Sequence, residues 1–282
     1  MESGATLYVV ATPIGNLEDI SARAIRVLGE VDLIAAEDTR HSARLLDHLG
    51  VSTPMLAYHD HNERERSGRL LDRIAAGESV ALISDAGTPL ISDPGYHLVS
   101  EARQRGIRVV PVPGASAMIA ALSVAGLPSD RFQFEGFLPA KRGARRQRIE
   151  QLASAEATWI FYESTHRILD CMEDLVELLG DDRELVVARE ISKTFETIQG
   201  GPVAEVLEWM RGDSNQQRGE FVVLVRGAPA QSGQDEVDPE TRRMLEILLE
   251  ELPLKQASAL ASRISGVRKK ALYQLALQLK GG

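Results

Sequence analysis

The segment with the clearest chemical character is 84–95, Ser-Asp-Ala-Gly-Thr-Pro-Leu-Ile-Ser-Asp-Pro-Gly. It follows the apolar run Val-Ala-Leu-Ile at 80–83, which predicts a buried strand, and a helix is expected to begin near Tyr96. Loops at the carboxyl ends of parallel strands are where open α/β sheets bind small molecules. Because glycine lets a ligand approach the backbone and proline fixes the turn, we predict a ligand-binding loop here.

Charged residues also stand where a neighbouring strand is predicted to end. Glu37, Asp38 and Arg40 come directly after the apolar run 33–36, in a pattern that fits a metal site, an acid/base site or a helix cap. We favour Asp38 as the N-cap of the next helix, with Arg40 pairing with Glu37. Glu37 and Arg40 stay candidates for the site, because the end of this strand is expected to face the crevice.

A second set of charged residues lies in the other half of the chain. Glu163 and Glu190 end two predicted strands, and Glu220 precedes the last one. Each carboxylate could simply cap a helix. Together with Arg189 and Lys193 they favour a polar wall that faces a substrate.

Other kinds of chemistry are disfavoured. No Ser-His-Asp order or nucleophile elbow is present, and Cys171 lies at an apolar position of a predicted helix, so covalent catalysis is not expected. His59 and His61 have a spacing that can chelate zinc, but no third ligand stands at motif spacing, and no metal is predicted. The loop 11–17 is neither a dinucleotide fingerprint nor a Walker motif.

The overall composition favours a water-soluble globular protein. The chain has 282 residues, a length that suits two domains and a small appendage, and 44% of its residues are hydrophobic. No apolar run reaches the roughly 20 residues that span a bilayer, and no signal peptide is recognised at residues 1–4, so no membrane is expected as a partner. One cysteine excludes an intrachain disulfide, and we expect a cytoplasmic protein.

The net charge of −9 argues against a nucleic-acid partner, but the distribution of basic residues along the chain does not. No acidic residue follows Glu251, whereas the same segment contains Arg268, Lys269 and Lys270. A second basic cluster contains Lys141, Arg142, Arg145, Arg146 and Arg148. Since salt screens charges beyond about 10 Å, local clusters can bind phosphates, although from these residues alone we favour a solvated helix end for the second cluster.

The elements that must position these residues alternate between strand and helix. Strands are predicted at 7–11, 33–36, 80–84 and 109–112, and then at 132–137, 158–162, 185–188 and 221–225. Helices are predicted at 21–29, 42–49, 70–76, 98–105, 117–125, 149–153, 168–179 and 203–210. This order predicts an α/β fold.

The domain boundaries follow from the turns and the composition. We predict one α/β domain at 1–115, a second at 116–228, a linker at 227–239 and a small helical domain at 236–282. Helices are expected there at 240–251, 256–264 and 268–279, the last two forming a helix-turn-helix-like pair. Its predicted inward-facing residues are Leu260, Ile264, Val267, Leu272, Leu275 and Leu279.

Six motifs occur in one order along the chain, at 12–17, 36–40, 84–89, 113–117, 161–164 and 188–190. In this respect the sequence resembles the tetrapyrrole-methylase superfamily, and within it the branch that methylates ribosomal RNA. The resemblance implies two α/β domains with S-adenosyl-L-methionine in the cleft between them, and a homodimer. It also implies 2′-O-methylation of a cytidine in the decoding region of 16S ribosomal RNA.

The resemblance further implies which residues form the site. Those expected to bind S-adenosylmethionine are Pro13, Gly15, Asn16, Asp85, Ala86, Gly87, Thr88, Pro89, Ile91, Ser116, Ala117, Tyr162 and Glu220. The catalytic residues are expected from the chemistry of transfer to a ribose hydroxyl instead: Glu190, Glu163, Arg189 and Lys193 would orient or deprotonate that hydroxyl. Glu190 is the preferred base, since a lysine could serve only with a strongly lowered pKa. Both basic clusters are expected to contact RNA.

Two alternatives stay open at this point. The first loop, Thr12-Pro13-Ile14-Gly15-Asn16, departs from the glycine-rich loop of many tetrapyrrole methylases, which fits an RNA acceptor better than a porphyrinoid. One alternative is nevertheless a methyltransferase that acts on a tetrapyrrole or another small acceptor. The other is a noncatalytic RNA-binding or assembly protein, which would bind RNA but not S-adenosylmethionine.

Overall fold

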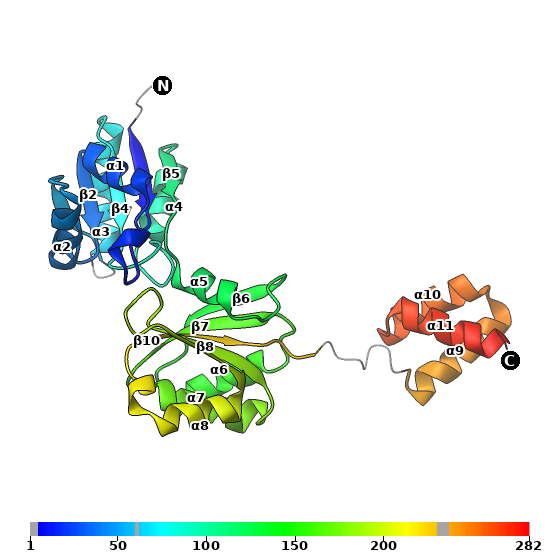
Figure 1. Ribbon diagram of the computed structural model, residues 1–282. Coiled ribbons are helices and arrows are strands. Elements are labelled where there is room, and N and C mark those ends of the chain that lie inside the picture. The colour runs from blue at the N-terminus through cyan, green and yellow to red at the C-terminus, as the bar shows by residue number, and fades with distance from the viewer. Residues whose placement is uncertain (1–4, 60–61, 230–236, 282) are drawn as a thin grey trace. The chain divides into compact units, whose positions relative to one another are not determined.

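The computed structural model describes residues 5–59, 62–229 and 237–281 (Figure 1). The chain divides into two compact units, Met1–Gly227 and Ala228–Gly282. Within residues 5–59 and 62–229 it forms two five-stranded sheets, so the predicted α/β class is confirmed. The predicted division of this unit at 115/116 falls between the last strand of one sheet and the next helix, and it stays a prediction.

All strand pairs of the first sheet are parallel, in the order β3-β2-β4-β1-β5. The strands are β1 (Thr6–Val10), β2 (Leu33–Ala36), β3 (Met55–Ala57), β4 (Val80–Ile83) and β5 (Arg108–Val112). The short edge strand β3 was not predicted. β2 and β4 are buried along their whole length, which explains their uninterrupted apolar sequences.

Helices cover both faces of the first sheet. Its helices are η1 (Leu17–Asp19), α1 (Ala22–Glu30), α2 (Thr39–Leu49), α3 (Glu63–Ala75) and α4 (Tyr96–Gln104). Residues of α1 and α2 pack with one face of the sheet, and residues of α3 and α4 pack with the other. The Asp38 carboxylate accepts the backbone N–H groups of Arg40 and His41, which confirms it as the cap of α2. The Arg40 guanidinium pairs with Asp38 at 3.5 Å, and its pairing with Glu37 stays a prediction.

The second sheet is mixed, with the order β6-β7-β10-β8-β9. Its strands are β6 (Phe132–Phe137), β7 (Thr158–Ser164), β8 (Glu184–Arg189), β9 (Thr197–Pro202) and β10 (Glu220–Val225). β6 and β7 are parallel, whereas β10 runs antiparallel to both β7 and β8. The first residue of β10 therefore lies beside the last residues of β7 and β8. The glycine-containing strand β9 was not predicted.

The helices of this part are α5 (Ala117–Val124), α6 (Arg142–Leu152), α7 (Ile168–Leu179), α8 (Val203–Gly212) and η2 (Ser214–Gln217). Residues of α5 pack on one face of the second sheet, and residues of α6, α7 and α8 on the other. Cys171 of α7 is fully buried between α6, α7, α8 and the second sheet, as predicted. Burial raises the pKa of its thiol, which makes the thiolate nucleophile inaccessible at neutral pH.

The unit Ala228–Gly282 is a helical bundle over its described residues. It consists of α9 (Pro239–Glu251), α10 (Leu254–Ser265) and α11 (Lys269–Gly281), and residues 230–236 of the predicted linker lie outside the described residues. Val267 and Leu272 are buried as predicted, but Ile264 is 62% exposed, so its inward assignment was wrong. The small residues Ala257 and Ala261 fill the core instead. In the part of the chain that is described, no helix has the length and apolar character of a membrane span.

Candidate active site

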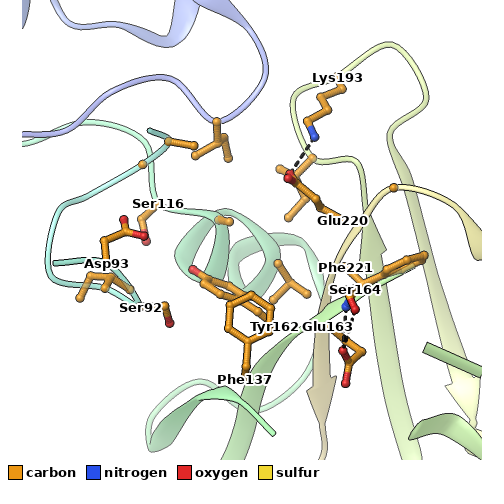
Figure 2. Close-up of a pocket in the computed structure, with 18 of the residues that line it drawn as sticks. Ser92, Asp93, Ser116, Phe137, Tyr162, Glu163, Ser164, Lys193, Glu220 and Phe221 are labelled. Carbon is orange, nitrogen blue, oxygen red and sulfur yellow. Dashed lines mark hydrogen bonds and ion pairs between the residues drawn. The ribbon is translucent and has the colours of Figure 1, made fainter. Parts of the chain in front are cut away.

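A cavity of about 510 Å³ lies where residues from both sheets meet (Figure 2). In Figure 2, Ser92, Asp93 and Ser116 lie on one side, and Lys193 and Glu220 lie on the other. The full lining is Ile14, Ala86, Gly87, Thr88, Ile91, Ser92, Asp93, Ser116, Ala117, Phe137, Tyr162, Glu163, Ser164, Thr165, His166, Ile191, Lys193, Gly219, Glu220, Phe221 and Val222.

The 84–95 loop forms one wall and is fixed to its neighbours. Thr12 N–H donates to the carbonyl of Gly87 at 2.8 Å, and Gly87 N–H returns a bond to the carbonyl of Thr12 at 3.1 Å. The hydroxyl of Thr88 donates to the carbonyl of Ala115 at 3.0 Å. These bonds join the loops after β1, β4 and β5, which are the carboxyl ends of three parallel strands. The 84–95 loop therefore lies at the carboxyl edge of the parallel sheet, where it was predicted to lie.

The backbone of this loop is strained where it lines the cavity. Gly87 has a φ of +82°, and an added Cβ would lie 3.3 Å from Cγ2 of Ile14. Leu90 and Ser92 are non-glycine residues that also have positive φ, at 75° and 66°. Residues in such conformations persist only where the surrounding structure holds them, and they concentrate at ligand sites.

Aromatic side chains from the second sheet form the facing wall. The Tyr162 ring makes edge contacts with the rings of Phe134 and Phe137, at centroid distances of 4.9 and 5.7 Å. Burial raises the pKa of the Tyr162 hydroxyl, and the charge of Asp93 acts in the same direction. Tyr162 is therefore a neutral, rigid surface of the kind that receives a flat apolar ring.

A charged cluster closes one rim of the cavity. The Lys193 ammonium lies 3.1 Å from Oε1 of Glu190 and 2.7 Å from Oε2 of Glu220. Burial alone would lower the pKa of Lys193, but the bonds to both carboxylates outweigh it and the pKa is raised. The condition under which this lysine could act as a base, a strongly lowered pKa, is not met.

Glu190 has a different position from the one a catalytic base requires. Burial would raise the pKa of its carboxyl, yet bonds from the backbone N–H of Glu220 and from Lys193 hold it below its ordinary value. The carboxylate packs against Gly219, where an added Cβ would lie 2.5 Å from Oε1. Glu190 does not line the cavity, so its geometry fits a residue that positions Lys193 and Glu220.

Two more of the predicted catalytic residues are bound within the protein. The Glu163 side chain is fully buried and holds the Arg167 guanidinium at 2.7 and 2.8 Å. Arg189, 7% exposed, donates to the backbone carbonyls of Arg218 and Phe195. Both side chains support the loops around the cavity, and Arg189 is not in its lining.

The residues predicted to bind the methyl donor divide into two groups. Eight of them line the cavity: Ala86, Gly87, Thr88, Ile91, Ser116, Ala117, Tyr162 and Glu220. Asn16 lines an adjoining recess of about 490 Å³, which shares Ile14, Ser116 and Ile191 with the cavity, and Pro13, Gly15, Asp85 and Pro89 line neither. Gly15 packs on the stem of Lys193, and Asp85 accepts the N–H of Asp38 at 3.0 Å, so both have supporting positions.

The sequence reasoning missed several lining residues. Ser92 and Asp93 belong to the quoted loop but were not assigned, and their polar types were a usable signal. Phe137 and Phe221 carried no local signal, because the pairing of their strands brings them to the cavity. His166, an exposed residue of the turn after β7, was likewise not assigned.

The basic cluster on α6 is mostly engaged inside the protein. Arg145 is 3% exposed and bonds to Asp174, which is fully buried. Arg142 and Arg146 also bond to Asp174, and Arg148 bonds to Glu135. Lys141 is exposed and Arg142 is 62% exposed. Arg145 is therefore not on the surface where RNA contact would require it.

The terminal basic residues lie around a groove of about 520 Å³ in the second unit. Arg268 and Lys270 line it together with Arg242 of α9, and Lys269 is exposed. For metal ions, the described residues contain no cluster of three or more histidine, cysteine, aspartate or glutamate side chains. His61 lies outside the described residues.

Comparison with known proteins defines the class. Residues 6–207 match the model of the Tetrapyrrole (Corrin/Porphyrin) Methylases, and residues 235–280 match that of the RsmI C-terminal HTH domain. The chain belongs to the tetrapyrrole methylase family. This membership confirms the expected class of enzyme, an S-adenosylmethionine-dependent methyltransferase.

Within this family, three relatives that match over nearly their full length share one name. The chain is 61% identical over 279 residues to the ribosomal RNA small subunit methyltransferase I of Pseudomonas aeruginosa, covering 99% of each chain. It is 54% identical to the protein of that name from Escherichia coli O157:H7, covering 99% of this chain and 97% of the relative. The relative from Haemophilus influenzae is also 54% identical, with 96% of each chain covered.

Solved structures share the fold. The uroporphyrin-III C-methyltransferase from Thermus thermophilus, complexed with S-adenyl homocysteine, is 19% identical with a TM-score of 0.53, covering 78% of this chain and 97% of that one. Diphthine synthase is 17% identical with a TM-score of 0.57, covering 78% and 90%. Because enzymes with such different names share the fold, the fold alone does not select the acceptor.

Proposed function

We propose that this enzyme transfers a methyl group from S-adenosylmethionine to the ribose 2′-hydroxyl of a cytidine in the decoding region of 16S ribosomal RNA. The observation that carries the proposal is the identity of 61% over 279 residues to a ribosomal RNA small subunit methyltransferase I. This identity covers 99% of the chain and so includes the terminal helical unit, whose residues 235–280 match the RsmI C-terminal HTH domain.

The cavity suits the methyl donor. Its lining combines apolar side chains such as Ile14 and Ile91, the neutral Tyr162 ring, and polar groups such as Thr88 and Ser116. Gly87 has no Cβ at the point where one would crowd Ile14, so a ligand can approach the loop backbone. When bound, S-adenosylmethionine supplies a methyl group on a positively charged sulfur, which is already activated for attack.

The residues around the cavity then have to orient a hydroxyl and accept its proton. Of the three carboxylates in the polar wall, Glu163 is fully buried against Arg167, and Glu190 does not line the cavity. Glu220 lines the cavity and its side chain is 82% exposed. We therefore assign Glu220 the role of facing the ribose hydroxyl, and Lys193 that of orienting it and attracting the phosphate backbone.

RNA would be held by exposed basic groups on both units. At the start of α6 these are the N-cap residue Lys141 and the first helical residue Arg142, since Arg145 is buried. On the helical unit they are Lys269 and the groove residues Arg268 and Lys270. Cations in these places neutralise phosphates without reading bases, so they would add affinity and orientation rather than select the cytidine.

We further propose that the enzyme works as a homodimer in the cytoplasm, where ribosomal subunits are assembled. Apolar residues on the surface of α5 support the dimer: Ile119 is 47% exposed and Val124 is 58% exposed. The helix has no polar face to present to water, since Ser123 is its one polar residue. Sedimentation of the purified protein measures the oligomeric state directly.

Calorimetry with S-adenosylmethionine, followed by methylation assays, tests the proposal. We expect saturable donor binding, and transfer of label to assembled small subunits at a ribose of 16S RNA. A porphyrinoid acceptor should receive no label. RNA binding without donor binding would instead support the noncatalytic alternative, and label on a small acceptor alone would support a tetrapyrrole-type enzyme.

A further inference from the structure

A buried carboxylate outside the cavity is bonded to the end of the 84–95 loop. Glu63, the first residue of α3, is 7% exposed. Its Oε1 accepts the backbone N–H of Gly95 and that of His97, both at 3.0 Å. The hydroxyl of the fully buried Tyr58 donates to the same oxygen at 3.1 Å. The acceptor of these bonds does not belong to α4, because Glu63 is a residue of α3.

These bonds replace a cap that α4 cannot make for itself. Its N-cap residue is Gly95, which has no side chain to accept the free N–H groups of the first turn. Gly95 has a φ of +132°, and an added Cβ would lie 2.8 Å from side-chain carbons of Leu82 and Leu90. A capping side chain is therefore excluded at this position, and the Glu63 carboxylate supplies the acceptor at the positive end of the helix.

The position of this cap matters because the 84–95 loop, which lines the cavity, ends there. The start of the 84–95 loop is joined to Thr12 through Gly87, and Thr88 is joined to Ala115. The part that follows, with the positive φ values of Leu90 and Ser92, ends at Gly95. Ile91, Ser92 and Asp93 of this part line the cavity. A strained segment keeps its conformation only if both its ends are fixed, and Glu63 fixes the second end.

We propose that Glu63 is a positioning residue for methyl-donor binding. It holds the carboxyl end of the 84–95 loop through the N–H groups of Gly95 and His97 and does not line the cavity itself. This role rests on the proposed function in one respect, which is that the ligand of this cavity is S-adenosylmethionine. Loss of the cap should release residues 90–95 and weaken donor binding, while the acceptor site on the second sheet keeps its geometry.

The test compares Glu63→Ala and Glu63→Gln with the matched variant Asp174→Asn. Asp174 is also a buried, multiply bonded carboxylate, but it lies on α7 and does not line the cavity. Each protein is titrated with S-adenosylmethionine by calorimetry. Hydrogen exchange of the amides of Gly95 and His97 is measured without ligand, and KM is determined for donor and for small subunits.

Glu63→Ala should raise the donor Kd about tenfold or more, because charge-assisted bonds to two N–H groups are lost. Glu63→Gln keeps an oxygen at Oε1 without its charge, so the increase should be about threefold. Both variants should speed exchange at Gly95 and His97 and raise the KM for donor, with the KM for subunits unchanged. Asp174→Asn should lower the melting temperature and leave donor Kd unchanged.

Unaltered donor Kd and unaltered exchange in Glu63→Gln would overturn the proposal, even if Glu63→Ala does not fold. Equal losses of donor affinity in Glu63→Gln and Asp174→Asn would also overturn it, because they would indicate general destabilisation. If the wild-type protein itself bound no S-adenosylmethionine, the proposed function would fail, and that result is separate from any difference between variants.

Discussion

The ammonium of Lys193 and the carboxylate of Glu220 form a 2.7 Å ion pair at the rim of the cavity (Figure 2). The two residues come from a loop after β8 and from the start of β10. They meet because β10 runs antiparallel to β8, and the backbone N–H of Glu190 bonds to the carbonyl of Glu220 at 2.9 Å. The pair places one positive and one negative group side by side in the lining of the cavity.

Replacing Lys193 by methionine should impair use of the RNA substrate more than binding of the donor. Methionine keeps the apolar stem that packs beside Gly15 but removes the charge. We expect kcat/KM for small subunits to fall about tenfold or more, since a charge-assisted bond is lost. Calorimetry should show donor Kd within about twofold of wild type. A tenfold loss of donor affinity with normal subunit kinetics would contradict the assigned role.

Gly87→Ala should weaken donor binding, whereas Gly50→Ala should not. Both glycines have positive φ, +82° and +68°, so each substitution should cost about 1 kcal/mol of folding free energy. Only at Gly87 does the new Cβ meet a cavity residue, Ile14. We expect donor Kd to rise about tenfold in Gly87→Ala, because a small displacement of the loop misplaces the ligand. Equal donor affinities in the two variants would exclude close contact at Gly87.

The exposed part of the basic cluster on α6 should contribute to RNA binding. Changing Lys141 and Arg142 to glutamine should weaken binding to a 16S RNA fragment. Since each lost phosphate contact lowers the salt slope of log K by roughly 0.7–0.9, the slope should fall by about 1.5. Arg145→Gln is the contrasting variant, because its buried pair with Asp174 predicts a loss of stability instead. An unchanged salt slope in the double variant would remove this surface from the proposed interface.

The buried network around Asp174 should make the protein sensitive to acid. Burial alone would raise the pKa of Asp174, but Arg145, Arg142 and Arg146 hold it below the ordinary 3.8. A lowered pKa means that the unfolded chain takes up the proton more readily, so this stabilisation is present above pH 3.8 and is lost as pH falls below it.

Asp174→Asn should therefore lower the free energy of unfolding by about 3 kcal/mol at pH 7. Below pH 3.8 the difference between variant and wild type should shrink, because the Asp174 carboxyl of the unfolded wild-type chain takes up a proton there, whereas the folded chain does so only at lower pH. Denaturant unfolding at pH 7 and pH 3 measures both quantities. A difference that is equal at the two pH values would show that the charge of Asp174 does not stabilise the fold.

The sequence alone was sufficient for four of the five strands of the first sheet and for the position of the 84–95 loop, but not for the edge strand β3. Strands buried on both faces need continuous apolar runs, so β2 and β4 could be located from local composition. The turn 84–95 follows such a strand, and parallel topology puts its loop at the binding edge. Asp38 was also recognisable, because a helix cap depends on neighbouring residues only. The full set of motifs in order was enough to indicate the family.

Only the tertiary structure decided which of the charged residues face the cavity. Arg145 belongs to a run that is polar in sequence, yet it is buried because Asp174 of another helix pairs with it. The helix α6 therefore begins earlier than its apolar residues predicted. Glu163 is buried against Arg167 and Glu190 lies outside the cavity lining, whereas Glu220, which pairs with Lys193, is brought to the rim by the direction of β10. The physical reason is that burial and pairing of a charge depend on groups distant in sequence, whereas helix caps and buried strands depend on near neighbours.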